Sequence, residues 1–89
     1  MAQLSLKIVN EKGLHARASA KFVEVVEDFS AQARVSRDGM SVSGDSIMGL
    51  LMLAASRGTT IEVATSGPQS DALAAALKAL VAGRFGEDR

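Results

Sequence analysis

The residues best suited to chemistry lie together in one segment, Gly13-Leu14-His15-Ala16-Arg17. His15 is the only histidine, and a helical pattern of apolar residues begins just after it, so the imidazole should lie at the amino end of a helix. Such an end presents unpaired backbone N–H groups and a partial positive charge, which bind phosphate. The Arg17 guanidinium adds donors whose geometry matches phosphate oxygens. The segment therefore predicts a nucleophilic imidazole beside an anion-binding site.

A plainer interpretation of the same residues has to be weighed. A histidine at the start of a helix is most often a capping or surface residue, and an arginine near it is most often simply solvated. No other cluster of carboxylates or hydroxyls in the chain offers a better site, which favours the chemical interpretation.

Composition argues against several other kinds of function. The 10 basic and 10 acidic residues are scattered, and the only aromatic residues are three Phe, which argues against a nucleic-acid partner. There is no cysteine, and a single histidine does not provide the usual zinc or copper ligands. The amino terminus lacks the pattern of a signal peptide, and no apolar stretch is long enough to span a bilayer. We expect a cytoplasmic protein with no metal, cofactor or membrane-inserted segment.

Alternating apolar and polar residues, the pattern of a half-buried strand, predict the strands of the domain. Two of these strands are expected to form a hairpin, because Asp38-Gly39 between them suits a tight turn with positive φ. The predicted strands cover residues 4–8, 33–35, 40–42 and 60–65.

A helical period predicts three helices. The first begins near Ala16, and the second covers about residues 47–54 with Ser46 as its capping residue. Gly58 is expected to close the second helix, and the third follows Gly67-Pro68 and ends near Gly83.

The element order β-α-β-β-α-β-α predicts an α+β fold. Helices packed on one face of a mainly antiparallel sheet bury these apolar faces most simply, which gives a two-layer, open-faced β-sandwich with four strands and three helices. Eighty-nine residues suffice for one domain spanning residues 1–89. Residues 84–89 match no pattern, and we expect them to form a loose carboxyl-terminal tail.

The second predicted helix is apolar on all sides. We expect Leu50, Leu53 and Ala54 to face the sheet. So small a domain cannot bury the rest, and methionines suit a surface that meets several partners in turn. The alternative is that these residues lie beneath the final helix. The residues predicted to form an exposed docking patch are Ile47, Met48, Leu51 and Met52.

Two segments resemble a known family. Gly13-Leu14-His15-Ala16-Arg17-Ala18-Ser19-Ala20 is similar to the active-site segment of the HPr family, the histidine phosphocarriers of the bacterial phosphoenolpyruvate-dependent sugar phosphotransferase system. Asp45-Ser46-Ile47-Met48-Gly49-Leu50 resembles the regulatory-serine segment of that family and lies at the expected separation. With the element order, the resemblance covers about residues 2–83.

The resemblance implies a phosphoryl carrier and not an enzyme. Enzyme I would phosphorylate His15 on Nδ1, the backbone N–H groups of Ala16 and Arg17 would hold the phosphoryl group while the Arg17 side chain supplies charge, and IIA domains would accept it. A monomer is expected, with Ala20 and the apolar patch as docking residues. The resemblance also implies that an HPr serine kinase/phosphorylase modifies Ser46. One residue departs from the motif, because the family usually has Pro where this chain has Ala18.

Two alternatives remain open at the level of sequence. The nitrogen-branch paralogue of the same family uses the same histidine chemistry for signalling. A small α+β ligand-binding regulatory module could adopt a similar sandwich with His15 incidental, because a fold alone does not establish a function.

Overall fold

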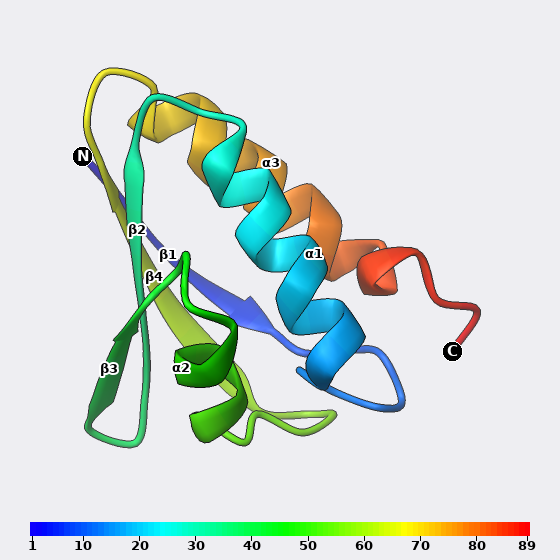
Figure 1. Ribbon diagram of the computed structural model, residues 1–89. Coiled ribbons are helices and arrows are strands. Elements are labelled where there is room, and N and C mark those ends of the chain that lie inside the picture. Colours follow the sequence, from blue (N-terminus) through cyan, green and yellow to red (C-terminus); the bar gives the residue numbers. More distant parts are fainter.

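The computed structural model describes residues 1–89, which form a sheet with helices packed on one face (Figure 1). The element order matches the predicted order and ends with an additional 3₁₀ turn. The elements are β1 (Ala2–Lys7), α1 (Ala16–Glu27), β2 (Gln32–Arg37), β3 (Met40–Ser43), α2 (Ile47–Met52), β4 (Thr60–Ser66), α3 (Ser70–Ala82) and η1 (Arg84–Gly86).

The four strands lie in the order β1-β4-β2-β3, and every neighbouring pair is antiparallel. Val63 of the central strand β4 is paired with Leu4 on one side and Val35 on the other. Strand alternation places Val35 and Val63 on the buried face. On the open face the Ser5 hydroxyl donates to the Glu62 carboxylate at 2.6 Å. The predicted α+β sandwich with one open face is confirmed.

The helices supply the other half of the core. Helix α3 packs on β1 and β4, α2 packs on β3, and α1 contacts both of the other helices (Figure 1). Phe22 and Val26 of α1 and Leu73 and Leu77 of α3 are buried, as their helical spacing predicts. No helix has both the length and the apolar character needed to cross a bilayer.

Helix α2 ends two residues earlier than the sequence predicts. Leu50 and Leu53 are buried as expected, but Ala54 is exposed and Ala55 is buried in its place. The reason is that Ala54 adopts the left-handed conformation, with φ of 51°, and so reverses the chain directly after the helix. Gly58, with φ of 90°, lies in the following loop and does not close α2.

Residues 84–89 do not form the loose tail that we expected. Phe85 has no exposed surface and belongs to the hydrophobic core. The Lys21 ammonium donates to the Phe85 carbonyl at 2.6 Å, and the Glu11 N–H donates to the Arg89 carbonyl at 2.9 Å. The segment is therefore packed against α1 and the loop that follows β1.

Candidate functional site

The loop before α1 places His15 at the amino end of that helix. Gly13 has φ of 67°, which a glycine adopts readily, and the Leu14 N–H donates to the Ala55 carbonyl at 2.8 Å. Leu14 is buried, so the loop is anchored beside the chain that leaves α2. His15 then takes an extended conformation as the N-cap residue, and α1 begins at Ala16 as predicted.

The first turn of α1 is open to a ligand. No group in the protein accepts a hydrogen bond from the backbone N–H of Ala16, Arg17 or Ala18, and the first turn contains no acidic residue. The first N–H with an internal partner is that of Ser19, which donates to the His15 carbonyl at 2.8 Å. The Arg17 side chain is exposed and forms no ion pair. Donors of this kind beside an imidazole are able to bind an anion.

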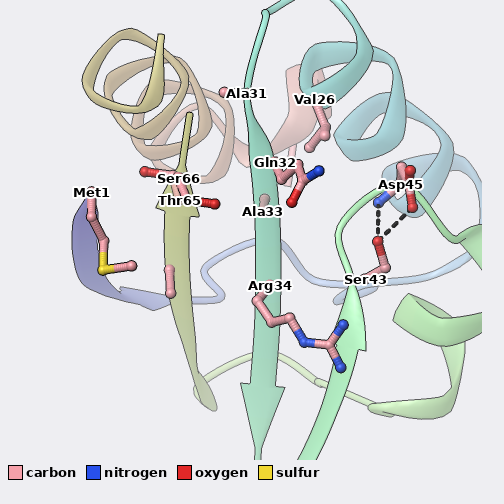
Figure 2. Close-up of a pocket in the computed structure, with 11 residues that line it drawn as sticks. Met1, Val26, Ala31, Gln32, Ala33, Arg34, Ser43, Asp45, Thr65 and Ser66 are labelled. Carbon is pink, nitrogen blue, oxygen red and sulfur yellow. Dashed lines mark hydrogen bonds between the residues drawn. The ribbon is translucent and has the colours of Figure 1, made fainter. Parts of the chain in front are cut away.

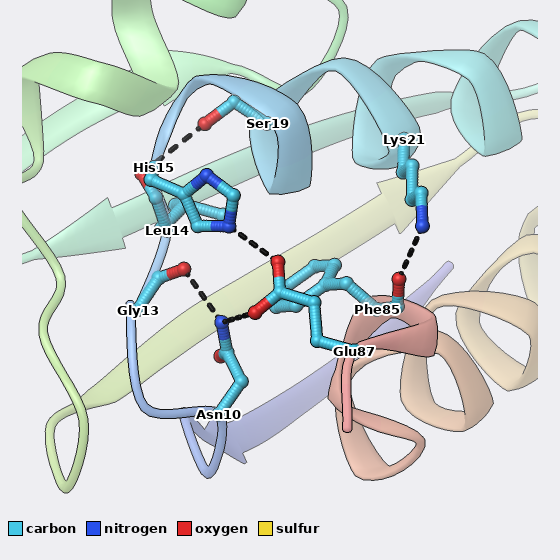
Figure 3. Close-up of polar contacts among 8 residues, drawn as sticks. All are labelled: Asn10, Gly13, Leu14, His15, Ser19, Lys21, Phe85 and Glu87. Carbon is cyan, nitrogen blue, oxygen red and sulfur yellow. Dashed lines mark hydrogen bonds and ion pairs between the residues drawn. The ribbon is translucent and has the colours of Figure 1, made fainter. Parts of the chain in front are cut away.

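The His15 ring is held from the carboxyl-terminal segment (Figure 3). Nε2 of His15 lies against Oε2 of Glu87, and Oε1 of Glu87 accepts a hydrogen bond from the Asn10 amide at 3.0 Å. Asn10 donates its other hydrogen to the Gly13 carbonyl at 2.8 Å. The side chains of His15 and Glu87 are 26% and 17% exposed, so the pair is partly shielded from water. With Nε2 engaged, Nδ1 is the ring nitrogen left for a ligand.

The pKa of Glu87 lies below its ordinary value. Burial of the carboxyl raises this pKa, but the hydrogen bonds from Asn10 and His15 and the positive charges of His15 and Lys12 outweigh that effect. Glu87 is therefore ionised near neutral pH and accepts a hydrogen bond from the ring.

The sequence predicted His15, Ala16 and Arg17 as site residues, but not the contacts that Asn10 and Glu87 make with this segment. Glu87 is 72 residues from its partner in sequence, and neither residue belongs to a motif or a periodic pattern. No group of three or more histidine or acidic side chains is arranged so that it could hold a metal ion.

Two hollows of similar size flank α1. One, of about 470 Å³, adjoins the Glu87 carboxylate and has no apolar lining residue; it is lined by Glu11, Lys12, Arg17, Lys21, Gly86, Glu87, Asp88 and Arg89. The other, of about 440 Å³, lies where α1 ends and β2 begins, and Figure 2 shows Arg34, Thr65 and Asp45 around it. This second hollow contains none of the residues that the sequence predicts for the functional site.

Helix α2 carries the predicted apolar patch and the predicted cap. Met48 and Met52 expose 70% and 63% of their surface and Ile47 exposes 40%, so these three do not lie beneath the final helix. Leu51 is half-buried, as is Ala20 on α1, the helix that α2 contacts. The Ser46 hydroxyl accepts a hydrogen bond from the Gly49 N–H at 3.0 Å, which confirms the capping role. We call Ile47, Met48, Leu51 and Met52 the α2 surface.

Comparison with known proteins identifies the family of the chain. The model of the family described as "PTS HPr component phosphorylation site" matches residues 2–83. The chain belongs to the HPr family. Members of the family are phosphoryl carriers of the phosphotransferase system, so the protein is a carrier and not an enzyme. Membership also implies enzyme I and IIA domains as its partners.

Individual HPr proteins resemble the chain over its whole length. The phosphocarrier protein HPr of Cupriavidus necator is 47% identical over 98% of both chains. A crystal structure of HPr from Thermoanaerobacter tengcongensis superposes with a TM-score of 0.95, at 35% identity and with both chains covered completely. The phosphocarrier protein NPr of Escherichia coli is 36% identical over 94% of both chains, and so is a more distant relative than the HPr of C. necator. The resemblance inferred from the two motifs is confirmed.

Proposed function

We propose that His15 is the residue of this HPr family member that carries the phosphoryl group, and that the group is bound to Nδ1. The observation that supports this assignment most strongly is that the two nitrogens of the imidazole have different surroundings. Nε2 is engaged by Glu87, whereas Nδ1 belongs to a residue that caps a helix whose first N–H groups have no partner.

The transfer requires little of the protein beyond placement and charge. The lone pair of Nδ1 attacks the phosphorus, a Nδ1–P bond forms, and the bond between phosphorus and enzyme I breaks with its electron pair returning to enzyme I. The N–H groups of Ala16 and Arg17 bind the phosphoryl oxygens, and the Arg17 guanidinium balances their charge. A nucleophile of a IIA domain then removes the group from Nδ1 by the same kind of displacement.

The α2 surface is proposed to dock enzyme I and the IIA domains in turn, together with Ala20. Its exposed methionines suit successive partners because their flexible side chains repack at little cost. The hydrogen bond between Leu14 and Ala55 joins the His15 loop to the chain that leaves α2, and α1 contacts α2, so a partner on this surface would be near the loop that carries the imidazole.

Ser46 is proposed as a regulatory site for a serine kinase of the HPr serine kinase/phosphorylase type. Its position supports this role, because Ser46 directly precedes Ile47 and Met48, and a phosphate there would stand at the edge of the α2 surface. We also propose that the protein acts as a monomer in the cytoplasm, where the phosphotransferase partners implied by its family operate.

The assignment is tested by labelling. Wild-type protein and His15→Ala are incubated with phosphoenolpyruvate and enzyme I, and intact mass and peptide mapping follow the product. The wild type should gain one acid-labile, base-stable phosphoryl group on His15, whereas His15→Ala should gain none while keeping the wild-type circular dichroism spectrum. Labelling of the variant at the wild-type level would exclude His15 as the carrier.

A further inference from the structure

We propose that Glu87 and Asn10 are positioning residues for the transfer: they hold the His15 imidazole in the tautomer that carries its proton on Nε2 and presents Nδ1 to the phosphoryl donor. This inference rests on the proposed role of His15. The two residues belong to neither of the motifs that identify the family, and they act through His15 without contact to the phosphoryl group.

Glu87 connects the imidazole to the loop that precedes it. One carboxylate oxygen lies against Nε2 of His15, and the other accepts from the Asn10 amide at 3.0 Å (Figure 3). Asn10 donates its second hydrogen to the Gly13 carbonyl at 2.8 Å, so both of its donors are used within the site. The orientation of this amide is fixed, because exchanging its nitrogen and oxygen would place an acceptor against two acceptors.

Asn10 has no exposed surface, and its Oδ1 atom has no hydrogen-bond partner in the protein. A buried polar atom without a partner destabilises the fold, and such atoms are uncommon enough to call for a functional explanation. Here the explanation is that the amide is used for its two donors, which fasten Glu87 to the His15 loop.

The carboxyl-terminal segment is held on both sides of Glu87. On one side Phe85 is completely buried, and Lys21 donates to its carbonyl; on the other side the Glu11 N–H donates to the Arg89 carbonyl. Arg84 and Phe85 both have positive φ, of 58° and 55°, which is unusual for residues other than glycine. Such conformations persist where the surrounding contacts enforce them, as they do here, so the carboxylate has a defined position.

The chemistry of the ring explains what this position achieves. A neutral imidazole has one N–H donor and one lone pair, and an ionised carboxylate only accepts, so the nitrogen that faces Glu87 must carry the proton. The lone pair is then on Nδ1. When Nδ1 bonds to phosphorus and the donor bond breaks, the ring becomes a cation that keeps its proton on Nε2. The Glu87 carboxylate stabilises that cation, as the aspartate of a Ser-His-Asp triad stabilises its imidazolium.

The test combines a spectrum with a rate. The ¹⁵N shifts of labelled histidine are measured at about pH 8.5, where an ordinary imidazole is neutral, for the wild type, Glu87→Ala, Asn10→Ala and the control Asp88→Ala. Asp88 is the neighbouring acidic residue, and it is exposed and forms no hydrogen bond with its side chain. Enzyme I-dependent phosphorylation is timed for the same four proteins, and thermal unfolding monitors the fold.

The wild type and Asp88→Ala should show the proton on Nε2 and the same rate of phosphorylation. Glu87→Ala should shift population toward the Nδ1–H tautomer and slow phosphorylation about tenfold or more, because a charge-assisted hydrogen bond is lost. Asn10→Ala should move both readouts in the same direction by a smaller factor, because the Phe85 anchor remains.

Wild-type tautomer populations and a rate within twofold of wild type in Glu87→Ala would overturn the proposal, even if Asn10→Ala fails to fold. The tautomer measurement needs no phosphorylation. Failure of the positioning role can therefore be distinguished from failure of the proposed function, in which the phosphoryl group would reside on a residue other than His15.

Discussion

Gly13 lies directly against the backbone of Ala55. A Cβ atom at Gly13 would come within 2.6 Å of the Ala55 carbonyl oxygen, the same atom that accepts the Leu14 N–H. The close approach fixes the loop that carries His15 to the chain that leaves α2. These backbone contacts therefore link the proposed docking helix to the loop that carries the imidazole.

Gly13→Ala should both destabilise the protein and slow phosphoryl transfer. The positive φ alone disfavours alanine by more than about 1 kcal/mol, and the clash with Ala55 adds to this and displaces the loop. Gly39→Ala is the matched control, because Gly39 also has positive φ, of 83°, with nothing within 4 Å of its Cβ position. Melting temperatures and transfer rates of both variants check the prediction. Equal losses in the two variants would mean that the contact with Ala55 has no role in the site.

Arg17→Ala should slow transfer far more than it affects folding. Arg17 is exposed and forms no ion pair, so its loss should change the melting temperature little. Losing a charge-assisted contact to the phosphoryl group costs about 1.5–3 kcal/mol, or roughly one to two orders of magnitude in rate. Arg34→Ala, an exposed arginine on β2, serves as the control and should transfer at the wild-type rate. A rate within a factor of two of wild type for Arg17→Ala would show that the backbone N–H groups suffice.

Ala18→Pro, which restores the residue usual in the family, should be tolerated. Ala18 is the third residue of α1, and its N–H has no internal partner, so proline removes no hydrogen bond. Restricting the unfolded chain should raise stability by about 0.4–1 kcal/mol, measured by thermal unfolding. Ala18 is completely buried, and a marked fall in the melting temperature would mean that the ring does not fit there.

Substitutions at Ser46 should separate stability from transfer. Ser46→Ala removes the cap to the Gly49 N–H and should cost about 1 kcal/mol of stability while transfer stays near normal. Ser46→Asp keeps a capping oxygen and should fold as well as the wild type. Its charge, however, stands beside Ile47 and Met48, and a partner that covers the α2 surface must desolvate it, which weakens binding. Melting temperature and enzyme I-dependent rate are measured on both variants. Wild-type transfer by Ser46→Asp would argue against the α2 surface as the docking site.

The parts of the molecule that the sequence predicted well are those determined by local pattern. Period-two and helical patterns identified all of the strands and the three α-helices, because each apolar face has to meet the core. The helix start at Ala16 and the open N–H groups beside His15 were predictable for the same reason, since they involve only neighbouring residues.

The features that the sequence did not reveal depend on contacts between distant residues or on turns without a signal. Glu87 reaches His15 because the burial of Phe85 and the hydrogen bond from Glu11 to Arg89 hold the segment in place. A single aromatic residue in a short segment forms no periodic pattern that could have predicted this packing. Ala54 closes α2 in a left-handed conformation that usually requires glycine, so Gly58 was wrongly expected in that role. In both cases tertiary packing selects a conformation that local preference does not.

The proposal that Nδ1 of His15 carries the phosphoryl group can be tested with a single NMR spectrum. Protein containing ¹⁵N-labelled histidine is phosphorylated with phosphoenolpyruvate and enzyme I, and NMR identifies the ring nitrogen bonded to phosphorus. The geometry predicts phosphorus on Nδ1 and a proton on Nε2, because Glu87 occupies the Nε2 side of the ring. Phosphorus bonded to Nε2, or a phosphorylated protein whose imidazole signals are unchanged, would exclude Nδ1 of His15 as the atom that carries the phosphoryl group.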